Sequence, residues 1–192
     1  MNEIKLKGRI VGLQIQTKFS ALTLITSSQA GFKSLPHIYV LDKDLKAEFD
    51  KSFKIGDMVT IRARVQTSKN RPTHIVAYAI EPTKRVFEEA FGVKKGMYED
   101  DLNEVKLQGT LTHVFIPPVS KATMALATIR TIDENGRTNY PVVTLFGQDA
   151  NTVKTIPLET DICFLGRIQT HRSEKEGKSR YFESIVGTIA KA

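Results

Sequence analysis

Two short stretches of this chain are nearly identical: NEIKLKG occupies residues 2–8 and NEVKLQG occupies residues 103–109. They begin 101 positions apart in a chain of 192 residues, so each opens about half of the sequence. This length suits one large domain or two domains of about a hundred residues. A repeat at this spacing favours two domains with the same fold.

Both stretches alternate between apolar and polar residues, as a half-buried β-strand does. The apolar series is Ile4, Leu6, Gly8 and Ile10 in the first copy and Val105, Leu107, Gly109 and Leu111 in the second. In the first copy the residues between them are Lys5, Lys7 and Arg9. The same strand is therefore predicted twice, with one face toward a core and the other toward solvent or a ligand.

The similarity continues in the same order through both halves. Segment 36–45 (PHIYVLDKDL) matches 141–150 (PVVTLFGQDA), 59–67 (VTIRARVQT) matches 162–170 (ICFLGRIQT), and 76–80 (VAYAI) matches 185–189 (IVGTI). For the second strand, the alignment pairs Leu22, Leu24 and Thr26 with Met124, Leu126 and Thr128. Each half therefore predicts five strands, with a helix between the third and fourth over 43–53 and 148–155.

Glycine interrupts the first strand of each half, at Gly8 and Gly109. A glycine inside a strand weakens it unless the sheet bends sharply there, as it does in a small coiled barrel. Five strands with a helix between the third and fourth is the order of the OB-fold. We therefore predict an all-β protein of two tandem OB-folds, each a five-stranded Greek-key barrel.

The segment between the halves predicts a short helix. Apolar residues at helical spacing precede a glycine that would end the helix: Val86, Phe87, Ala90, Phe91 and Gly92. We assign residues 1–83 to the first OB-fold, 84–102 to a helical linker and 103–192 to the second OB-fold. The apolar side of this helix would pack on one barrel or, alternatively, contact another subunit.

Composition indicates a folded protein with an anionic partner. The chain is 41% hydrophobic and carries a net charge of +7, and residues 1–83 hold 13 basic against 7 acidic residues. Such an excess favours a polyanion. No apolar run approaches the ~20 residues of a membrane span, and no signal segment is visible. With Cys163 as the single cysteine, we expect a reducing, cytoplasmic location.

The second half opens with an Asn-x-hydrophobic-x-Leu-x-Gly strand, has an aromatic-Gly-x-x-Ala segment entering its helix, and continues with a Gly-Arg strand. These motifs resemble those of the bacterial and phage single-stranded-DNA-binding proteins. The matching residues are Asn103, Leu107, Gly109, Phe146, Gly147, Ala150, Gly166 and Arg167, and the first half retains Asn2, Leu6, Gly8, Gly56 and Arg64. The resemblance implies two DNA-binding barrels and, since four barrels per assembly are usual in the family, a homodimer, with a monomer as the alternative.

The chain departs from the family pattern in three ways. It contains no tryptophan, although the aromatic residue of the family motif is usually tryptophan. Leu41 and Asp42 stand where the second half has Phe146 and Gly147, so the barrels need not bind equally well. The sequence ends in IVGTIAKA without the acidic-tipped tail of cellular members. It therefore resembles phage or mobile-element versions, and recruitment of partners through such a tip is in doubt.

Binding of single strands requires cations for the phosphates and flat side chains for the bases. The phosphate-binding candidates lie on the outward faces of the first and fourth strands and in the loops at the mouth of each barrel: Lys5, Lys7, Arg9, Lys18, Arg62, Arg64, Lys69, Arg71, Lys106, Arg167, Arg172, Lys175, Lys178 and Arg180. For any one of them, the alternative is a solvated strand face. The basic segment 170–182 predicts a hairpin that closes over DNA or, alternatively, a plain exposed hairpin.

The base-stacking candidates are Phe19, Phe32, Tyr39, Phe115, Tyr140, Phe146 and Tyr181. Phe146 could instead belong to the core. Three further aromatic residues lie in apolar patterns and are interpreted as packing residues: Phe53, Tyr78 and Phe164.

Catalytic and metal-binding patterns are missing from the sequence. Four histidines are scattered without metal-ligand spacing, and GVKKG lacks the spacing of a phosphate-binding P-loop. We expect no enzymatic activity, cofactor or metal. The leading hypothesis is a protein that coats and protects single-stranded DNA in replication, recombination or DNA transfer, largely without sequence preference. The alternatives are a protein-interaction scaffold, because fold does not fix function, and an RNA-binding protein.

Overall fold

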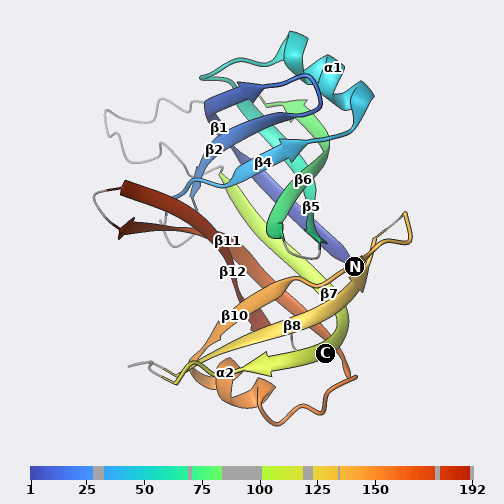
Figure 1. Cartoon of the computed structure of the whole chain (residues 1–192), viewed down its shortest axis with the longest axis vertical. Coiled ribbons are helices and arrows are strands. Elements are labelled where there is room, and N and C mark those ends of the chain that lie inside the picture. Colours follow the sequence, from blue (N-terminus) through green and yellow to red (C-terminus); the bar gives the residue numbers. More distant parts are fainter. Residues whose placement is uncertain are drawn as a thin grey trace, which may run out of the picture. The chain divides into compact units, whose positions relative to one another are not determined.

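The computed structural model describes residues 1–27, 33–68, 71–83, 101–118, 123–133, 135–175 and 178–190, and these are mostly β-strand (Figure 1). The first half of the described chain contains β1 (Asn2–Ile15), β2 (Ser20–Ser27), β3 (Lys33–Ser34), β4 (His37–Val40), α1 (Lys43–Ser52), β5 (Met58–Ser68) and β6 (Arg71–Pro82). The second half contains β7 (Leu102–Phe115), β8 (Met124–Ile132), β9 (Thr138–Asn139), β10 (Val142–Phe146), α2 (Gly147–Val153), β11 (Asp161–Lys175) and β12 (Lys178–Ile189).

Each half forms a closed β-barrel with the same strand order. In the N-terminal barrel the order is β3-β2-β4-β6-β5-β1, and β1 also pairs with β2. In the C-terminal barrel the order is β7-β11-β12-β10-β8-β9, and β7 also pairs with β8. The strand before the helix is parallel to the last strand in both barrels. The prediction of five-stranded barrels with a helix between the third and fourth strands is confirmed, and β3 and β9 are additional two-residue strands.

Packing divides the chain into two compact units. One comprises Lys5–Arg64 and Ile75–Asn103, and the other comprises Met1–Ile4, Val65–His74 and Glu104–Ala192. The predicted linker helix lies in residues 84–100, outside the described residues. In the part of the chain that the structure describes, neither helix has the length and apolar character needed to cross a bilayer.

The two barrels repeat the same backbone hydrogen bond between the second strand and a proline. Leu24 N donates to Pro36 O at 3.0 Å in the N-terminal barrel, and Ile129 N donates to Pro141 O at 3.1 Å in the C-terminal barrel. Leu24 pairs with Ile10 on β1, as Ile129 pairs with Leu111 on β7. These bonds fix which residues are equivalent in the two barrels.

Gly8 and Gly109 lie where the first strand of each barrel passes closest to the second. A Cβ at position 8 would lie 2.2 Å from Ile25 O, and one at position 109 would lie 2.1 Å from Arg130 O. Any side chain would therefore force the two backbones apart. The predicted role of these glycines in a tight bend has a steric cause: the strands can close into a barrel because no Cβ stands between them.

The predicted alignment of β2 with β8, the second strands of the two barrels, is wrong by three positions. Because Leu24 is equivalent to Ile129 and not to Leu126, the inward residues of β8 are Ala125, Ala127, Ile129 and Thr131. The connection between β1 and β2 spans residues 16–19, and the connection between β7 and β8 spans residues 116–123. The β7–β8 connection is therefore four residues longer. A register error of an odd number of residues reverses the faces of a strand. Met124 and Leu126, which the sequence alignment matched with the buried Leu22 and Leu24, therefore point outward.

Helix α1 is tied to β2 through Asp50. The carboxylate accepts a hydrogen bond from Ser20 Oγ at 2.6 Å and forms an ion pair with Lys46, one turn earlier in the helix. Desolvation raises the pKa of Asp50, but the hydrogen bonds from Lys46 and Ser20 and the charge of Lys46 outweigh it, so the pKa lies below the ordinary value of an aspartate. The charged form is therefore the one that the folded state favours.

Replacing Gly8 with alanine should destabilise the protein, and replacing Gly12 in the same strand should not. Overpacking against backbone costs about 1–3 kcal/mol, and a Cβ at position 8 meets the Ile25 carbonyl. A Cβ at position 12 meets only the Thr23 side chain at 3.4 Å. Urea denaturation of Gly8→Ala and Gly12→Ala measures the difference. Equal midpoints for both variants would contradict the proposed close approach.

Replacing Asp50 with asparagine should lower stability at neutral pH by about 1 kcal/mol, the usual size for a charge-assisted hydrogen bond in a partly exposed site. Because the folded-state pKa is depressed, the stabilisation is present above the unfolded-state pKa of about 3.9 and is lost as pH falls through the folded value. The difference in stability between Asp50→Asn and the wild type, measured by denaturation, should therefore be larger at pH 7 than at pH 3. Glu48→Gln, at an exposed position of α1, is the matched control and should show no such difference.

Candidate nucleic-acid interface

The predicted cations of the N-terminal barrel lie on the outward faces of two neighbouring strands. On β1, Lys5, Lys7 and Arg9 alternate with buried residues, and on β5, Arg62 and Arg64 do the same. β1 and β5 are adjacent in the sheet. Arg9 and Arg62 are exposed, and the other three side chains are half-buried. The structure thus brings together the five cations that the sequence pattern grouped.

The rings of the N-terminal barrel gather on the outward face of β2 and β4. Tyr39 on β4 contacts Phe19, which precedes β2, with ring centroids 5.7 Å apart. His37, two residues before Tyr39, meets the same ring edge-on at 5.0 Å, and its Nδ1 lies 3.3 Å from Thr23 Oγ1. All three rings are half-buried, so part of each remains accessible. We call Phe19, His37 and Tyr39 the Tyr39 cluster. Lys18, next to Phe19, is exposed.

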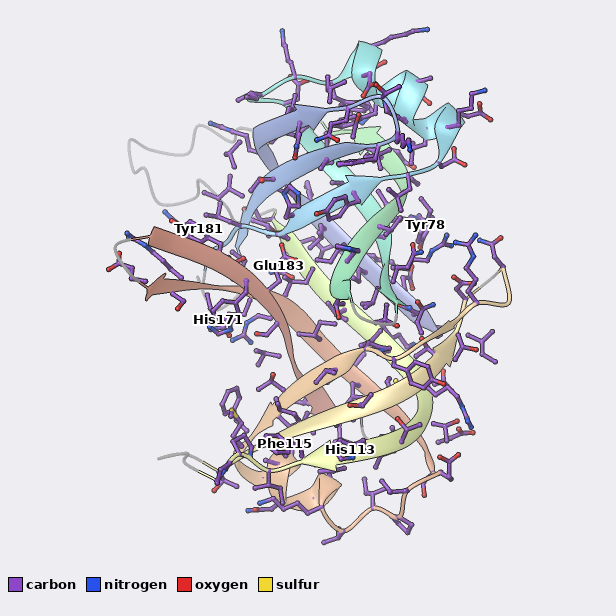
Figure 2. All side chains as sticks on the ribbon, viewed as in Figure 1. Tyr78, His113, Phe115, His171, Tyr181 and Glu183 are labelled. Carbon is purple, nitrogen blue, oxygen red and sulfur yellow. The ribbon has the colours of Figure 1, made fainter. Side chains whose placement is uncertain are left out.

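The C-terminal barrel carries exposed rings on the equivalent strands. Phe115 on β7 pairs with Leu126 on β8, and Phe146 at the end of β10 pairs with Met124 on β8. Phe115 and Phe146 are each 47% exposed, so the interpretation of Phe146 as a core residue is wrong. Val142 on β10 is also exposed. We call Phe115, Met124, Leu126, Val142 and Phe146 the Phe115 face; Figure 2 labels Phe115 and its neighbour His113 on β7.

Register shows that the two barrels use the same face but different positions for their rings. Tyr39 is equivalent to Thr144, and His37 is equivalent to Val142, because Leu22–Ile38 and Ala127–Val143 are equivalent cross-strand pairs. Phe146 in turn is equivalent to Leu41. The Tyr39 cluster and the Phe115 face therefore occupy equivalent three-stranded surfaces, β1-β2-β4 and β7-β8-β10, although their rings do not occupy equivalent positions.

The first and fourth strands of the C-terminal barrel carry fewer of the predicted cations than β1 and β5 do. Lys106 is exposed on β7, opposite Leu165 of β11, and Arg167 is half-buried on β11. Two predicted residues, Phe32 and Lys69, lie outside the described residues. The structure places the backbone of four further candidates in strands without describing their side chains: Arg71, Lys175, Lys178 and Arg180.

Two further candidates, Tyr140 and Tyr181, are exposed outside the strand pairs that form the Phe115 face. Tyr140 precedes β10 and is 48% exposed; its N–H donates to Thr67 Oγ1 at 2.8 Å. Tyr181 is 61% exposed on β12, opposite Arg172 of β11. Arg172 forms an ion pair with Glu174.

Of the three predicted packing residues, two pack and one does not. Phe164 is 1% exposed, and Phe53 stacks on buried Phe49 with centroids 5.5 Å apart. Tyr78 is 37% exposed, contrary to the prediction (Figure 2).

Sequence reasoning missed His37, Phe182 and the outward Met124 and Leu126. His37 could have been found, because it lies two positions from Tyr39 and so shares its face. Met124 and Leu126 were missed because of the register error in β8. Among the described residues, no three or more His, Cys, Asp or Glu side chains gather as they would around a metal ion.

No protein-family model matches the chain, and no curated protein matches its sequence. Its fold is similar to that of solved structures along its whole length. The wild-type single-stranded DNA binding protein from Thermus aquaticus matches with a TM-score of 0.67 and 14% identity, over 100% of this chain and 93% of that one. A deletion mutant of the same protein (delta 228-252 R190A) matches with a TM-score of 0.63 and 13% identity, over 100% and 94%. These matches show that the chain consists of two OB-folds in the arrangement of strands found there.

Proposed function

We propose that this protein binds single-stranded DNA, largely without sequence preference, and coats and protects strands exposed in replication, recombination or DNA transfer. The proposed role requires no catalysis. Each barrel would hold unpaired bases on its outward three-stranded face, and cations on the neighbouring strands would contact the phosphates.

The observation that carries this proposal is the presence of accessible rings on equivalent faces of both barrels. The second and third strands of an OB-fold, with the loops beside them, are the surface that binds oligonucleotides. The Tyr39 cluster and the Phe115 face lie on that surface in each barrel. If these rings served only to stabilise the barrels, they would be expected inward, where smaller residues such as Ala125 and Ala127 are found instead.

The distribution of charge supports the same function. Arg9 and Arg62 are exposed beside Lys5, Lys7 and Arg64 on adjacent strands, and the chain as a whole carries +7. Phosphate contacts supply sequence-independent affinity for nucleic acid. The two similar structures reported above are of the single-stranded DNA binding protein from Thermus aquaticus, which supports DNA as the first ligand to test.

The assembly that we propose is a homodimer, which would supply four barrels, with a monomer as the alternative. A scaffold function is the second candidate, since an outward apolar surface such as the Phe115 face also suits a protein partner. RNA is the alternative nucleic acid. Sedimentation gives the subunit count, and competition among single-stranded DNA, single-stranded RNA and duplex oligomers of matched length ranks the ligands.

Binding of oligo-dT should weaken as salt rises, with log K falling by about 0.7 per phosphate contact for each unit of log salt. Arg62→Ala and Arg9→Ala should each make this slope shallower by about the same amount. Lys54→Ala, at an exposed position in the turn before β5, is the control and should leave the slope unchanged. Fluorescence anisotropy over a salt series measures all four proteins.

A slope that is flat in the wild type, or unchanged in Arg62→Ala, would count against phosphate binding by the β1–β5 face. If Lys5, Arg62 and Arg64 could all be reversed to glutamate without loss of activity, the scaffold function would be favoured.

Removing a ring from either barrel should weaken binding, because a base stacked on an aromatic side chain contributes ~1–3 kcal/mol. Tyr39→Leu tests the N-terminal barrel, and Phe115→Leu tests the C-terminal barrel. Ile55→Ala and Leu158→Ala are matched controls, because these side chains are 61% and 55% exposed in equivalent turns after the helices. Titration with oligo-dT should show losses for the ring variants only. Losses confined to one barrel would restrict the binding surface to that barrel.

A further inference from the structure

The hairpin formed by β11 and β12 extends beyond the C-terminal barrel. β11 pairs with β7 from Asp161 to Gly166, and β12 pairs with β10 at Ile185 and Val186. From Gln169–Ser184 to Lys175–Lys178 the described strands pair only with each other. This part is a two-stranded ribbon, so both of its faces are available for contact. The labels of His171, Tyr181 and Glu183 locate it in Figure 2.

Each face of the ribbon presents a ring. Tyr181 and Phe182 are consecutive, so their side chains point to opposite faces, and they are 61% and 53% exposed. On one face Tyr181 is directly opposite Arg172, and on the other Phe182 is directly opposite His171. In a ribbon that served only to cover one bound strand, a second exposed ring on the far face would have no function.

The Phe182 face is preorganised as a flat platform. The rings of Phe182 and His171 are stacked, with centroids 5.1 Å apart and planes 18° from parallel. His171 is held in turn by Ser184, whose Oγ lies 2.7 Å from its Nε2. A platform fixed before binding loses little side-chain freedom when a base is added to the stack.

The charge of this ribbon is compatible with nucleic acid as its occupant. Residues 169–184 contain four basic residues and three acidic ones, Arg172, Lys175, Lys178 and Arg180 against Glu174, Glu176 and Glu183, which is a net charge of +1. Flat rings with a cationic excess are the combination that unpaired bases on a phosphate backbone require.

We propose that the β11–β12 ribbon stacks unpaired bases on both of its faces at once and so joins two segments of single-stranded nucleic acid. The segments are either two parts of one strand that turns round the ribbon or two separate strands. This inference rests on the proposed function. It adds to strand coating a bridging activity that the barrel faces alone do not provide.

The test uses the full chain and oligo-dT of graded length, with Tyr181→Leu, Phe182→Leu and the double variant. For oligomers long enough to reach both faces, each single variant should weaken binding about 5- to 150-fold, the equivalent of one lost stacked base. The two losses should multiply in the double variant. Phe182→Tyr keeps a ring and should retain binding, and Ser173→Ala, on the Phe182 face of the same ribbon, should have no effect.

Energy transfer between dyes on the oligomers distinguishes one strand that turns round the ribbon from two separate strands. Dyes on the two ends of one long oligomer report a strand that turns round the ribbon, and dyes on two short oligomers report two strands. In either experiment, energy transfer that is lower in both Tyr181→Leu and Phe182→Leu than in the wild type supports the inference. Thermal melting checks that the variants fold; if Phe182→Leu melts early, His171→Ala, which removes the stacking partner, replaces it.

Two results would overturn the inference while leaving the proposed function intact. In the first, Phe182→Leu has the same affinity for oligo-dT and the same energy transfer as the wild type. In the second, the double variant loses no more affinity than Tyr181→Leu does. A wild-type protein that binds no oligomer at low salt would instead reject the proposed function itself.

Discussion

The backbones of the first and second strands approach so closely in each barrel that no side chain fits between them. The carbonyl oxygens of Ile25 and Arg130 lie 2.2 and 2.1 Å from where a Cβ would stand at positions 8 and 109. This contact lets the first strand pair with both of its neighbours and close the barrel. Closure determines which residues face inward, and therefore which are left outside for a ligand. The outward rings depend on the register that this contact sets.

Much of the fold could be predicted from the sequence because its strongest signals are local. The alternation of residues 2–10, the repeated glycine and the two helices required no knowledge of distant contacts, and α1 and α2 lie at 43–52 and 147–153, within two residues of their predicted ends. The second strand of the C-terminal half could not be placed in the same way. The large side chains of Met124 and Leu126 favoured their alignment with Leu22 and Leu24, but the connection before β8 is longer, and the hydrogen bond from Ile129 to Pro141 shows that Ile129 is the residue equivalent to Leu24.

The candidate site was predictable where it follows alternation and unpredictable where it depends on pairing between strands. Lys5, Lys7 and Arg9 were assigned to the outer face because every second residue of β1 is apolar, and the pattern on β5 identified Arg62 and Arg64 in the same way. The clustering of Phe19, His37 and Tyr39 depends on which residues of β2 and β4 are opposite each other, information that a single sequence does not contain. The exposure of Phe146 likewise depends on its place at the start of α2, where the chain leaves the sheet.

The equivalence of Tyr39 with Thr144 and of Phe146 with Leu41 has an evolutionary consequence. After an internal duplication, the inward-facing residues of each strand are constrained by the same packing and the same backbone contacts. The outward-facing residues are constrained only by the groups that they contact. The two copies can therefore diverge on one surface without any loss of foldability. A protein built in this way can give its halves separate tasks, one richer in polar rings and the other in apolar ones, while still inheriting a single architecture.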